Sequence, residues 1–348
     1  MTRLSALPLL VAAMTLGGCV SDGPSQSVAN TPLAGASASG AAPIPLAERA
    51  LPATLAEHWI TVSEGKTLLE GPSLDRQGNL IFTDPFGGKL LRASPDGNVT
   101  TLHDFGKDGP GGTAIHRDGR IFVAVTADHF TRGYIVALQP DGSQPEMIVP
   151  PERGLVPNDL VFDEQGGIYF TDFRGSSTEP SGGVYYVAPG GGEITTVLPD
   201  IARGNGVAMS PDGKTLWVIE YSKSRLHRID LQAPGRPAAN GTQVAYHFAG
   251  PPPDSMRVDS AGHLYVALNG QARVLVFADN GVPIAQILLP GREQGRHPAT
   301  TNLAIAPDEA TAYIVSGDRK GDSGANIFRA RALAPGLELF SHRPVSAR

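Results

Sequence analysis

A hairpin pattern that recurs at nearly constant spacing limits the fold of this chain more than any other feature. Each copy has a head residue, an apolar strand, a turn and a second strand, and most copies have Asp or Ser five residues after the head and Gly eight residues after it. The copies are EGPSLDRQGNLIF, GGTAIHRDGRIFV, NDLVFDEQGGIYF, NGVAMSPDGKTLWV, DSMRVDSAGHLYV and TNLAIAPDEATAYIV. Their heads are Glu70, Gly111, Asn158, Asn205, Asp254 and Thr301, which lie 41, 47, 47, 49 and 47 residues apart. A period of about 40–50 residues with roughly four short strands is typical of propeller blades. The sequence therefore predicts an all-β, six-bladed β-propeller with four-stranded blades.

The position of the heads within the blades gives them a role that the turn residues lack. The Asp or Ser and the Gly after each head have the chemistry of hairpin turns, and we interpret them in that way. If each head begins the innermost strand of its blade, the turns lie on one face of the ring and all six heads meet at the other. The segment EHWITVSEG, residues 57–65, is predicted to add a strand to the last blade and close the ring.

The heads form an oxygen-only set of side chains at the predicted mouth of the central channel. Glu70 and Asp254 supply carboxylates, Asn158 and Asn205 supply amides, and no head is Cys or His. Hard oxygen ligands of this kind suit Ca²⁺, with Mg²⁺ or Mn²⁺ less favoured and Zn²⁺ disfavoured. Two carboxylates would neutralise one divalent ion. The alternative is that these residues cap strand ends singly by bonding backbone groups, but polar side chains at four of six equivalent positions favour a central metal site.

Several stretches resemble one known family closely. GGIYFTDFRGSSTEPSGGVYYVAP, LWVIEYSKSRLHRI, PDSMRVDSAGHLYVA and RVLVFADNGVPIAQILLPGR resemble the senescence marker protein/gluconolactonase/luciferin-regenerating-enzyme-like family of six-bladed propellers, and the drug-responsive lactonase branch most of all. The likeness covers about residues 65–330. It implies a catalytic calcium held by Glu70, Asn205 and Asp254, with Ser255 as a further ligand from that branch.

The same resemblance implies two departures from the drug-responsive branch. Where that branch has an acidic ligand, this chain has the amide of Asn158, which lowers the negative charge of the site by one. The branch also holds a structural calcium before its third blade, and the matching stretch PPERGLVP lacks a comparable run of oxygen ligands. One Ca²⁺ ion is therefore expected, with other divalent cations as alternatives.

Both lines of reasoning predict a calcium-dependent hydrolase that acts as a lactonase. The ion would polarise the lactone carbonyl for attack by water, and Asp254 is the acid/base that the resemblance implies. No Gly-x-Ser-x-Gly motif supplies a serine nucleophile. The alternatives are a non-catalytic propeller that serves as a binding or scaffold module of the cell envelope, and a related metal-dependent esterase or phosphotriesterase.

Four further residues are candidate substrate contacts on the same rim: Asp159, Arg174, His129 and His297. Each also has an ordinary structural interpretation. Asp159 follows the head Asn158 directly, and a hydrogen bond at the strand edge explains it as well as a role in the site does. A single histidine on a rim is more often incidental than catalytic.

The N-terminal region indicates export. Residues 1–19 have one basic residue, Arg3, and a short apolar run, as in a signal peptide. Leu16-Gly17-Gly18-Cys19 resembles a bacterial lipobox, so we expect lipidation of Cys19. Residues 20–48 are predicted to be a flexible tether and residues 49–348 the propeller. The alternative is an ordinary secreted protein with an incidental thiol.

These observations also set the expected location and partners. We expect a lipoprotein of the cell envelope, at the outer membrane or periplasmic face in a Gram-negative cell, that meets the membrane only through its lipid. Net charge is −6 and no block of five like charges occurs, so a nucleic-acid partner is not expected. The expected partner is a small lactone or ester, and the expected state is a monomer.

Overall fold

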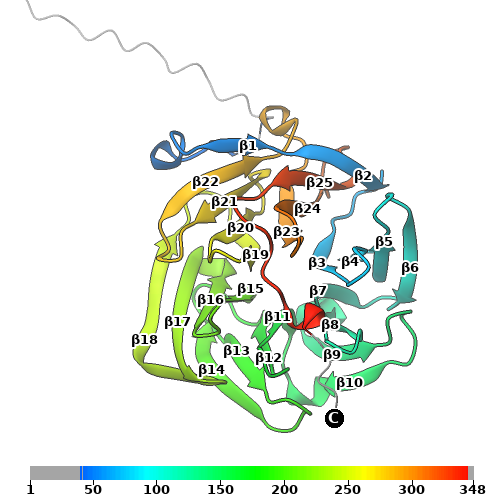
Figure 1. Cartoon of the computed structure of the whole chain (residues 1–348), viewed down its shortest axis with the longest axis vertical. Helices are drawn as coiled ribbons and strands as arrows, with labels where there is room; N and C mark the ends of the chain where they lie inside the picture. Colours follow the sequence, from blue (N-terminus) through cyan, green and yellow to red (C-terminus); the bar gives the residue numbers. More distant parts are fainter. Residues whose placement is uncertain (1–39, 41, 344–348) are drawn as a thin grey trace, which may run out of the picture. The chain divides into compact units, whose positions relative to one another are not determined.

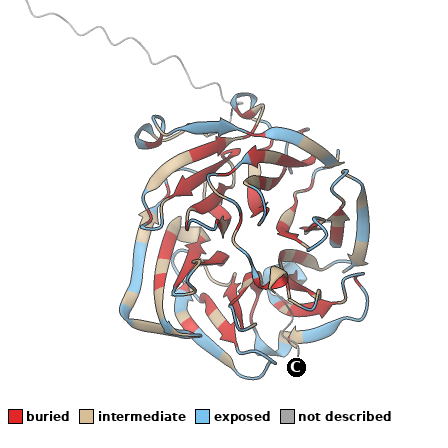
Figure 2. Cartoon of the chain, in the orientation of Figure 1, coloured by how far each residue is buried: buried red, intermediate tan, exposed pale blue. Residues whose placement is uncertain are grey.

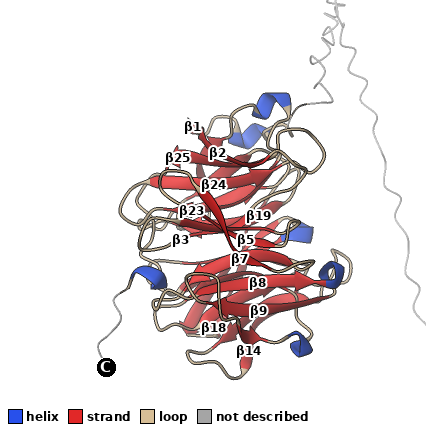
Figure 3. Ribbon diagram, turned by 90° about the vertical axis from the view of Figure 1, so that its right-hand side faces the viewer, coloured by secondary structure: helices blue, strands red, loops and turns tan. Residues whose placement is uncertain are grey.

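Six β-sheets follow one another around a central channel in the computed structural model, which describes residues 40 and 42–343 (Figure 1). In each sheet the inner strands follow one another in sequence order from the channel outward and are antiparallel to their neighbours, and two of the sheets gain an outermost strand from the N-terminal segment. Seen edge-on, the sheets lie between two faces made of loops and short 3₁₀ helices (Figure 3). The prediction of an all-β, six-bladed propeller with four-stranded blades is confirmed.

The blades are numbered here by the order of their innermost strands. Blade 1 consists of β3 (Glu70–Leu74), β4 (Leu80–Asp84), β5 (Lys89–Ala93) and β6 (Val99–Asp104). Blade 2 consists of β7 (Gly109–Ile115), β8 (Ile121–Ala127), β9 (Arg132–Leu138) and β10 (Glu146–Val149). Blade 3 consists of β11 (Pro157–Phe162), β12 (Ile168–Asp172), β13 (Gly182–Val187) and β14 (Ile194–Ile201).

The remaining blades follow the same plan. Blade 4 consists of β15 (Gly204–Met209), β16 (Thr215–Glu220), β17 (Arg225–Ala233) and β18 (Arg236–His247). Blade 5 consists of β19 (Pro253–Val258), β20 (Leu264–Leu268), β21 (Arg273–Phe277) and β22 (Pro283–Leu288). Blade 6 consists of β23 (Ala299–Ile305), β24 (Thr311–Gly317), β25 (Ala325–Arg331) and β2 (Glu57–Ser63). The 3₁₀ helices are η1 (Leu46–Glu48), η2 (Asp128–Phe130), η3 (Pro151–Arg153), η4 (Tyr221–Lys223), η5 (Arg292–Gln294) and η6 (Phe340–His342).

The segment before the first blade joins the two ends of the ring. Strand β2 pairs antiparallel with β25 as the outermost strand of blade 6, which confirms the predicted closure. Strand β1 (Ala53–Leu55) pairs parallel with β22 and gives blade 5 a fifth strand that the sequence did not predict. One continuous segment therefore binds two neighbouring blades.

The core lies between the faces of adjacent blades, where apolar side chains of inner strands interlock. One cluster joins blades 4 and 5 through Trp217, Met256 and Phe277, which are each 2% exposed or less. Every residue of β16 is buried, whereas the outer strand β18 has no buried residue (Figure 2). Burial thus falls from the channel to the rim, as the repeat of the sequence requires.

The predicted turns use their acidic residues as expected. In blade 3, Oδ1 of Asp163 accepts hydrogen bonds from the backbone N–H groups of Gln165 (2.9 Å) and Gly167 (2.8 Å). Asp75 and Asp259 make the equivalent bonds in blades 1 and 5. The interpretation of this position as a turn residue is confirmed.

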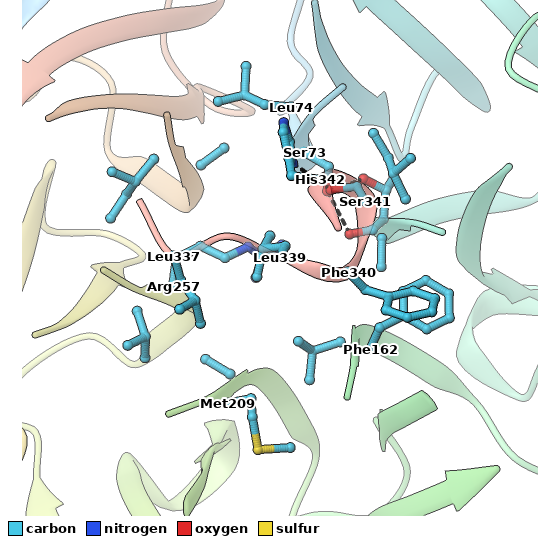
Figure 4. Close-up of a pocket in the computed structure, with 18 of the residues that line it drawn as sticks. Ser73, Leu74, Phe162, Met209, Arg257, Leu337, Leu339, Phe340, Ser341 and His342 are labelled. Carbon is cyan, nitrogen blue, oxygen red and sulfur yellow. Dashed lines mark hydrogen bonds between the residues drawn. The ribbon is translucent and has the colours of Figure 1, made fainter. Parts of the chain in front are cut away.

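The C-terminal segment after β25 crosses the turn face of the channel. Leu333 N donates to the Tyr265 hydroxyl at 2.7 Å, and Gly336 N donates to Ala306 O at 2.6 Å. The ring of Phe340 in η6 lies 5.4 Å from that of Phe162 and 4.9 Å from that of His116. Together with the inner strands, this segment encloses a cavity of about 50 Å³ in the channel (Figure 4).

The sequence predicted that the propeller begins at residue 49, but the packed part of the chain begins earlier. Glu48 is 3% exposed and pairs with Arg273 of blade 5 at 2.5 Å. The Arg292 guanidinium donates to Ala42 O. Ala42 and Glu48, which lie in the predicted tether, contact η5 and blade 5 respectively. The predicted signal peptide, Cys19 and most of the tether lie outside the described residues. Within residues 40 and 42–343, no helix has the length and apolarity needed to cross a membrane.

Candidate metal centre

A β-bulge occurs near the start of every innermost strand, at or beside the predicted head. In β11, Pro157 pairs with Asp172 and Leu160 pairs with Phe170, so Asn158 and Asp159 both face the single residue Thr171. The same register shift occurs in the other five inner strands. Bulges release residues from the hydrogen-bond ladder and redirect their side chains. Five of the six heads therefore stand within a bulge at the mouth of the channel, and Glu70, which pairs with Thr83, stands directly before one.

Two carboxylates, the buried Asp254 and the half-buried Glu70, and three amides meet at this mouth. Asp254 accepts hydrogen bonds from Asn205 Nδ2 at its Oδ1 and from Asn269 Nδ2 at its Oδ2, both at 2.7 Å. Glu70 accepts from its neighbour Gly71 N (2.9 Å) and from Asn302 Nδ2 (3.2 Å) at its Oε2. The structure thus brings Asn205 and Asp254, two of the predicted metal ligands, into direct contact.

The electrostatics of the pair show the cost of two charges in a buried site. Burial raises the pKa of Glu70 well above its ordinary value, and the negative charge of Asp254 raises it further. Burial also raises the pKa of Asp254 to about 7, against the opposing effect of its hydrogen bonds from Asn269 and Asn205. Desolvated carboxylates resist ionisation unless a positive charge stands close by. A divalent cation would supply that charge.

The donor set fits a hard divalent cation. Glu70 and Asp254 supply carboxylate oxygens, and Asn158, Asn205 and Ser255 supply neutral oxygens. Asn158 is half-buried, and no hydrogen bond links its side chain to another of the described residues. Among residues 40 and 42–343, no group of three or more His, Cys, Asp and Glu side chains is arranged to hold a metal. A site here therefore depends on amide and hydroxyl oxygens as well as on the two carboxylates.

Asp159 lies beside this set and has partners of its own. Its side chain is 1% exposed, and its Oδ2 accepts hydrogen bonds from Ser255 Oγ at 2.9 Å and from Arg257 Nη1 at 3.2 Å. Its Oδ1 accepts from Leu160 N at 2.9 Å. Asp159 of blade 3 thus reaches within the channel to blade 5, past the intervening blade 4.

Glycines allow the inner strands to approach one another at the mouth. A Cβ added to Gly112 would lie 2.3 Å from Oδ1 of Asp159 and 2.7 Å from its Cα, closer than real Cβ atoms come. A Cβ on Gly206 would lie 2.6 Å from the Cα of Ser255. Gly111 at the second head therefore belongs to a glycine pair that makes room for the polar residues of the next blade.

The three rim candidates have different surroundings. Arg174 pairs with the fully buried Asp172, with its Nη2 2.7 Å and its Nε 2.8 Å from Oδ2. His129 is exposed in η2, at a backbone φ of +57°. His297 is 6% exposed and lies 4.9 Å from the ring of Phe328 in blade 6, where burial lowers its pKa to about 4. None of the three shares a hydrogen bond with Glu70 or Asp254 in the described chain.

Three aromatic side chains form a wall that the sequence did not predict. Burial raises the pKa of Tyr221, and the negative charge of Asp254 raises it further. The ring of Tyr221 lies 5.6 Å from that of Phe173, which lies 5.8 Å from that of Phe130. Phe130 is 51% exposed. The three rings therefore form a row that ends in an exposed side chain.

The enclosed cavity of the channel lies below this centre and is distinct from it. Its walls come from the later residues of the inner strands and from the C-terminal segment, including Leu74, Phe162, Met209, Leu339 and Phe340 (Figure 4). Arg257 reaches both the cavity and Asp159. The polar centre thus opens to one face, and an apolar floor separates it from the other.

These features define a six-bladed propeller with an oxygen-lined centre at one mouth of its channel. The chain belongs to the SMP-30/gluconolactonase/LRE-like family, whose sequence profile matches residues 68–318. The predicted family resemblance is confirmed.

Two relatives with the same name illustrate the likeness. Lactonase drp35 of Staphylococcus saprophyticus is 44% identical over 303 residues, which are 86% of this chain and 94% of the relative. Lactonase drp35 of Staphylococcus aureus strain MW2 is 39% identical over 299 residues, 85% of this chain and 92% of the relative. The similarity therefore extends over the whole propeller.

Solved structures of lower identity share the fold. A gluconolactonase from Xanthomonas campestris matches with a TM-score of 0.63 at 23% identity, over 78% of this chain and 88% of that protein. A calcium-binding regucalcin from Agrobacterium tumefaciens matches with a TM-score of 0.66 at 21% identity, over 82% and 98%. At such identities these matches bear on the architecture alone.

Proposed function

We propose that this protein is a calcium-dependent lactonase that opens lactone rings by attack of water. The observation that carries the proposal is the pair of carboxylates, the half-buried Glu70 and the buried Asp254, among amide and hydroxyl oxygens at the channel mouth. Its relatives are named lactonases and are 38–44% identical to it over most of its length. The chain is therefore a hydrolase of carboxylic ester bonds.

Five residues would hold the ion: Glu70, Asn158, Asn205, Asp254 and Ser255. A bound Ca²⁺ would polarise the ester carbonyl and offset the negative charge that develops on its oxygen. The Nδ2–H group of Asn205 donates a hydrogen bond to Oδ1 of Asp254. A half-turn of that amide exchanges its nitrogen and oxygen, so the same side chain can present oxygen to a cation.

Asp254 is the residue to which we assign proton transfer. Rotation of Asn205 releases Oδ1 of Asp254, and Asn269 holds Oδ2 at 2.7 Å. A carboxylate oxygen has two lone pairs, so Oδ2 can accept the hydrogen bond from Asn269 and still take a proton from water. Asn269 thereby fixes the direction from which the proton is taken.

The aromatic wall supplies the apolar contact for the organic part of the substrate. Tyr221, Phe173 and Phe130 form a row of rings that ends in an exposed side chain. Burying part of a lactone ring against this wall would place its carbonyl toward Asp254 and exclude water from one side. Arg174, paired with Asp172, lies after β12 beside Phe173 and is a candidate contact for a polar substituent.

The test is lactone hydrolysis in chelator and again after addition of Ca²⁺, for the wild type and for Asp254→Asn. Asp230→Asn is the matched control, because Asp230 is 43% exposed on β17 of blade 4. We expect activity to vanish in chelator, to return with Ca²⁺ and to be lost only in Asp254→Asn. Activity that persists unchanged in chelator would contradict the metal mechanism. Measured Ca²⁺ binding without hydrolysis of any γ-, δ- or aromatic lactone would favour a scaffold.

We also propose that Cys19 is lipidated and that the protein is an exported lipoprotein of the cell envelope. The support is the short apolar run followed by Leu16-Gly17-Gly18-Cys19. Metabolic labelling with a fatty acid should mark the wild type and leave Cys19→Ser unlabelled. Equal labelling of both proteins would contradict the assignment.

A further inference from the structure

We propose that Asp159 and Arg257 form a positioning pair that turns the hydroxyl hydrogen of Ser255 away from the metal centre and keeps a third carboxylate out of the ion's ligand shell. The inference rests on the proposed metal site. It assigns Asp159 to the support of a ligand, in place of the substrate contact that the sequence suggested.

The position of Asp159 is fixed from several directions. The Leu160 N–H donates to its Oδ1, and its own N–H donates to Thr171 Oγ1 at 3.1 Å. Its Oδ2 accepts from Ser255 and from Arg257, both on β19 of blade 5, which is two blades further round the ring. With 1% of its surface exposed, this carboxylate can reorient only by breaking several of these bonds.

The hydrogen bond that Ser255 donates to Asp159 determines whether the hydroxyl oxygen presents lone pairs or its hydrogen to the metal centre. A hydroxyl group has one hydrogen and two lone pairs. Ser255 Oγ lies 2.9 Å from Asp159 Oδ2 and 3.4 Å from Asn205 Oδ1, so the hydrogen goes to Asp159. The lone pairs are then left for the side that holds Asn205 and Asp254. A cation requires lone pairs and is repelled by a hydroxyl hydrogen.

Arg257 balances the charge that this arrangement introduces. Three carboxylates, Glu70, Asp159 and Asp254, lie close enough for the charge of Asp159 to act on both others. The Arg257 side chain is 12% exposed and donates to Asp159 and to Met256 O at 2.7 Å. Three negative charges and one guanidinium leave a net charge of −2, which matches one divalent ion. A buried charge of either sign is costly without such compensation.

The pair also explains the glycine opposite it. A side chain at Gly112 would meet both Oδ1 and Cα of Asp159. The space at Gly112 of blade 2 therefore lets the carboxylate of Asp159 stand at the channel beside it. Asp159 is thus held by blade 5 through hydrogen bonds and given room by a glycine of the adjacent blade 2.

A double-mutant cycle on Ca²⁺ affinity tests the positioning role. One change is Ser255→Ala. The other is Asp159→Ala with Arg257→Met, which removes both charges together and leaves no unpaired ion. We expect each change alone to raise the Kd for Ca²⁺ about tenfold, within the range of coupling between residues in contact. We expect no further rise when the pair is removed from the Ser255→Ala protein. Independent, multiplicative effects would overturn the inference.

A second variant tests the charge balance with a readout that a structural role would not give. Arg257→Met alone leaves Asp159 uncompensated beside the centre. We expect tighter Ca²⁺ binding together with a lower melting temperature in chelator, because the ion then relieves a larger repulsion. Arg228→Met is the control, since Arg228 pairs with the half-exposed Asp230 of blade 4, and its Kd should equal that of the wild type. Weaker Ca²⁺ binding by Arg257→Met would overturn the charge argument.

The outcomes separate this inference from the proposed function. Calorimetry on the wild type comes first, and absence of Ca²⁺ binding would remove the metal site itself. Ca²⁺ binding by the wild type with an additive cycle would remove only the roles of Asp159 and Arg257. Circular dichroism and the melting temperature of each variant in chelator identify any protein that has not folded.

Discussion

The buried ion pair between Glu48 and Arg273 joins the N-terminal segment to blade 5, and its loss should be costly. Glu48 accepts hydrogen bonds from Arg273 at 2.5 Å and from the Tyr246 hydroxyl at 2.7 Å. Arg273 is 1% exposed, and its other partners are the side-chain oxygens of Gln271 and Gln286. The substitution Glu48→Gln keeps the shape and removes the charge, which leaves the guanidinium buried without its counter-ion.

The magnitude follows from this geometry. Removing one partner of a buried pair costs about 3–5 kcal/mol, and we expect the lower end because two glutamine oxygens still accept from Arg273. With an unfolding entropy of about 2.1 cal/mol/K per residue over roughly 300 residues, 3 kcal/mol corresponds to a fall of about 5 °C in melting temperature. The measurement is thermal and urea unfolding followed by circular dichroism.

Two controls make the result specific. Glu293→Gln removes a carboxylate that is 76% exposed and solvated, and its buried partner Arg292 keeps hydrogen bonds to Gln271 O and Ala42 O, so we expect a cost of about 0–1 kcal/mol. Glu48→Gln combined with Arg273→Met removes both buried charges and should recover most of the loss. The reasoning is refuted if Glu48→Gln unfolds at the same midpoint as Glu293→Gln, or if the double substitution is the least stable of the three.

Three further predictions concern other parts of the ring. Burial acts to raise the pKa of Glu220, but the hydrogen bond from His227 and other contacts outweigh it and lower the pKa to about 2. The ionised carboxylate therefore stabilises the fold by about 2–3 kcal/mol. This contribution is present above pH 4.5, the ordinary pKa of the group, and is lost as the pH falls toward 2. Urea unfolding at pH 7 and pH 3 should therefore show a larger loss for the wild type than for Glu220→Gln, and equal losses would contradict this linkage. Gly112→Ala should displace Asp159 and weaken Ca²⁺ binding by calorimetry, whereas unchanged affinity would show that the channel wall yields. Phe340→Ala, which removes a ring 4% exposed, should release the C-terminal segment to limited proteolysis; continued protection would show that the backbone bonds alone hold it.

The repeat made the fold and the position of the centre predictable. A constant period fixes where each inner strand begins, so Glu70, Asn158, Asn205 and Asp254 were placed at one mouth from spacing alone. Their bulged conformation was not predicted, because the sequence records which residues stand at the heads and not how the ladder skips past them.

Two amides of the centre, Asn269 and Asn302, were missed for identifiable reasons. Asn302 follows the head Thr301, and the bulge of β23 displaces the polar contact by one position. Asn269 lies in the loop after β20, outside the aligned repeat. An amide next to a head, or directly after a second strand, was the available signal.

Contacts between distant parts of the chain could not be predicted from the sequence. The role of Asp159 depends on Arg257, 98 residues later, and no pattern links the two. The C-terminal segment and β1 have no counterpart in the repeat, so neither the closed floor of the channel nor the fifth strand of blade 5 was foreseen.

The segment of residues 53–63 has a mechanical consequence. Its first strand, β1, lies parallel to β22 and is extended by bonds from Gln286 N to Pro52 O and from Ala56 N to Leu288 O, each 2.9 Å long. A pull on the chain ahead of residue 42 would therefore reach the hydrogen bond from Arg292 to Ala42 O first, then the Glu48 pair, and only then load these bonds in shear. The seam between the first and last parts of the ring, which β2 closes, would carry that force only after β1 had given way.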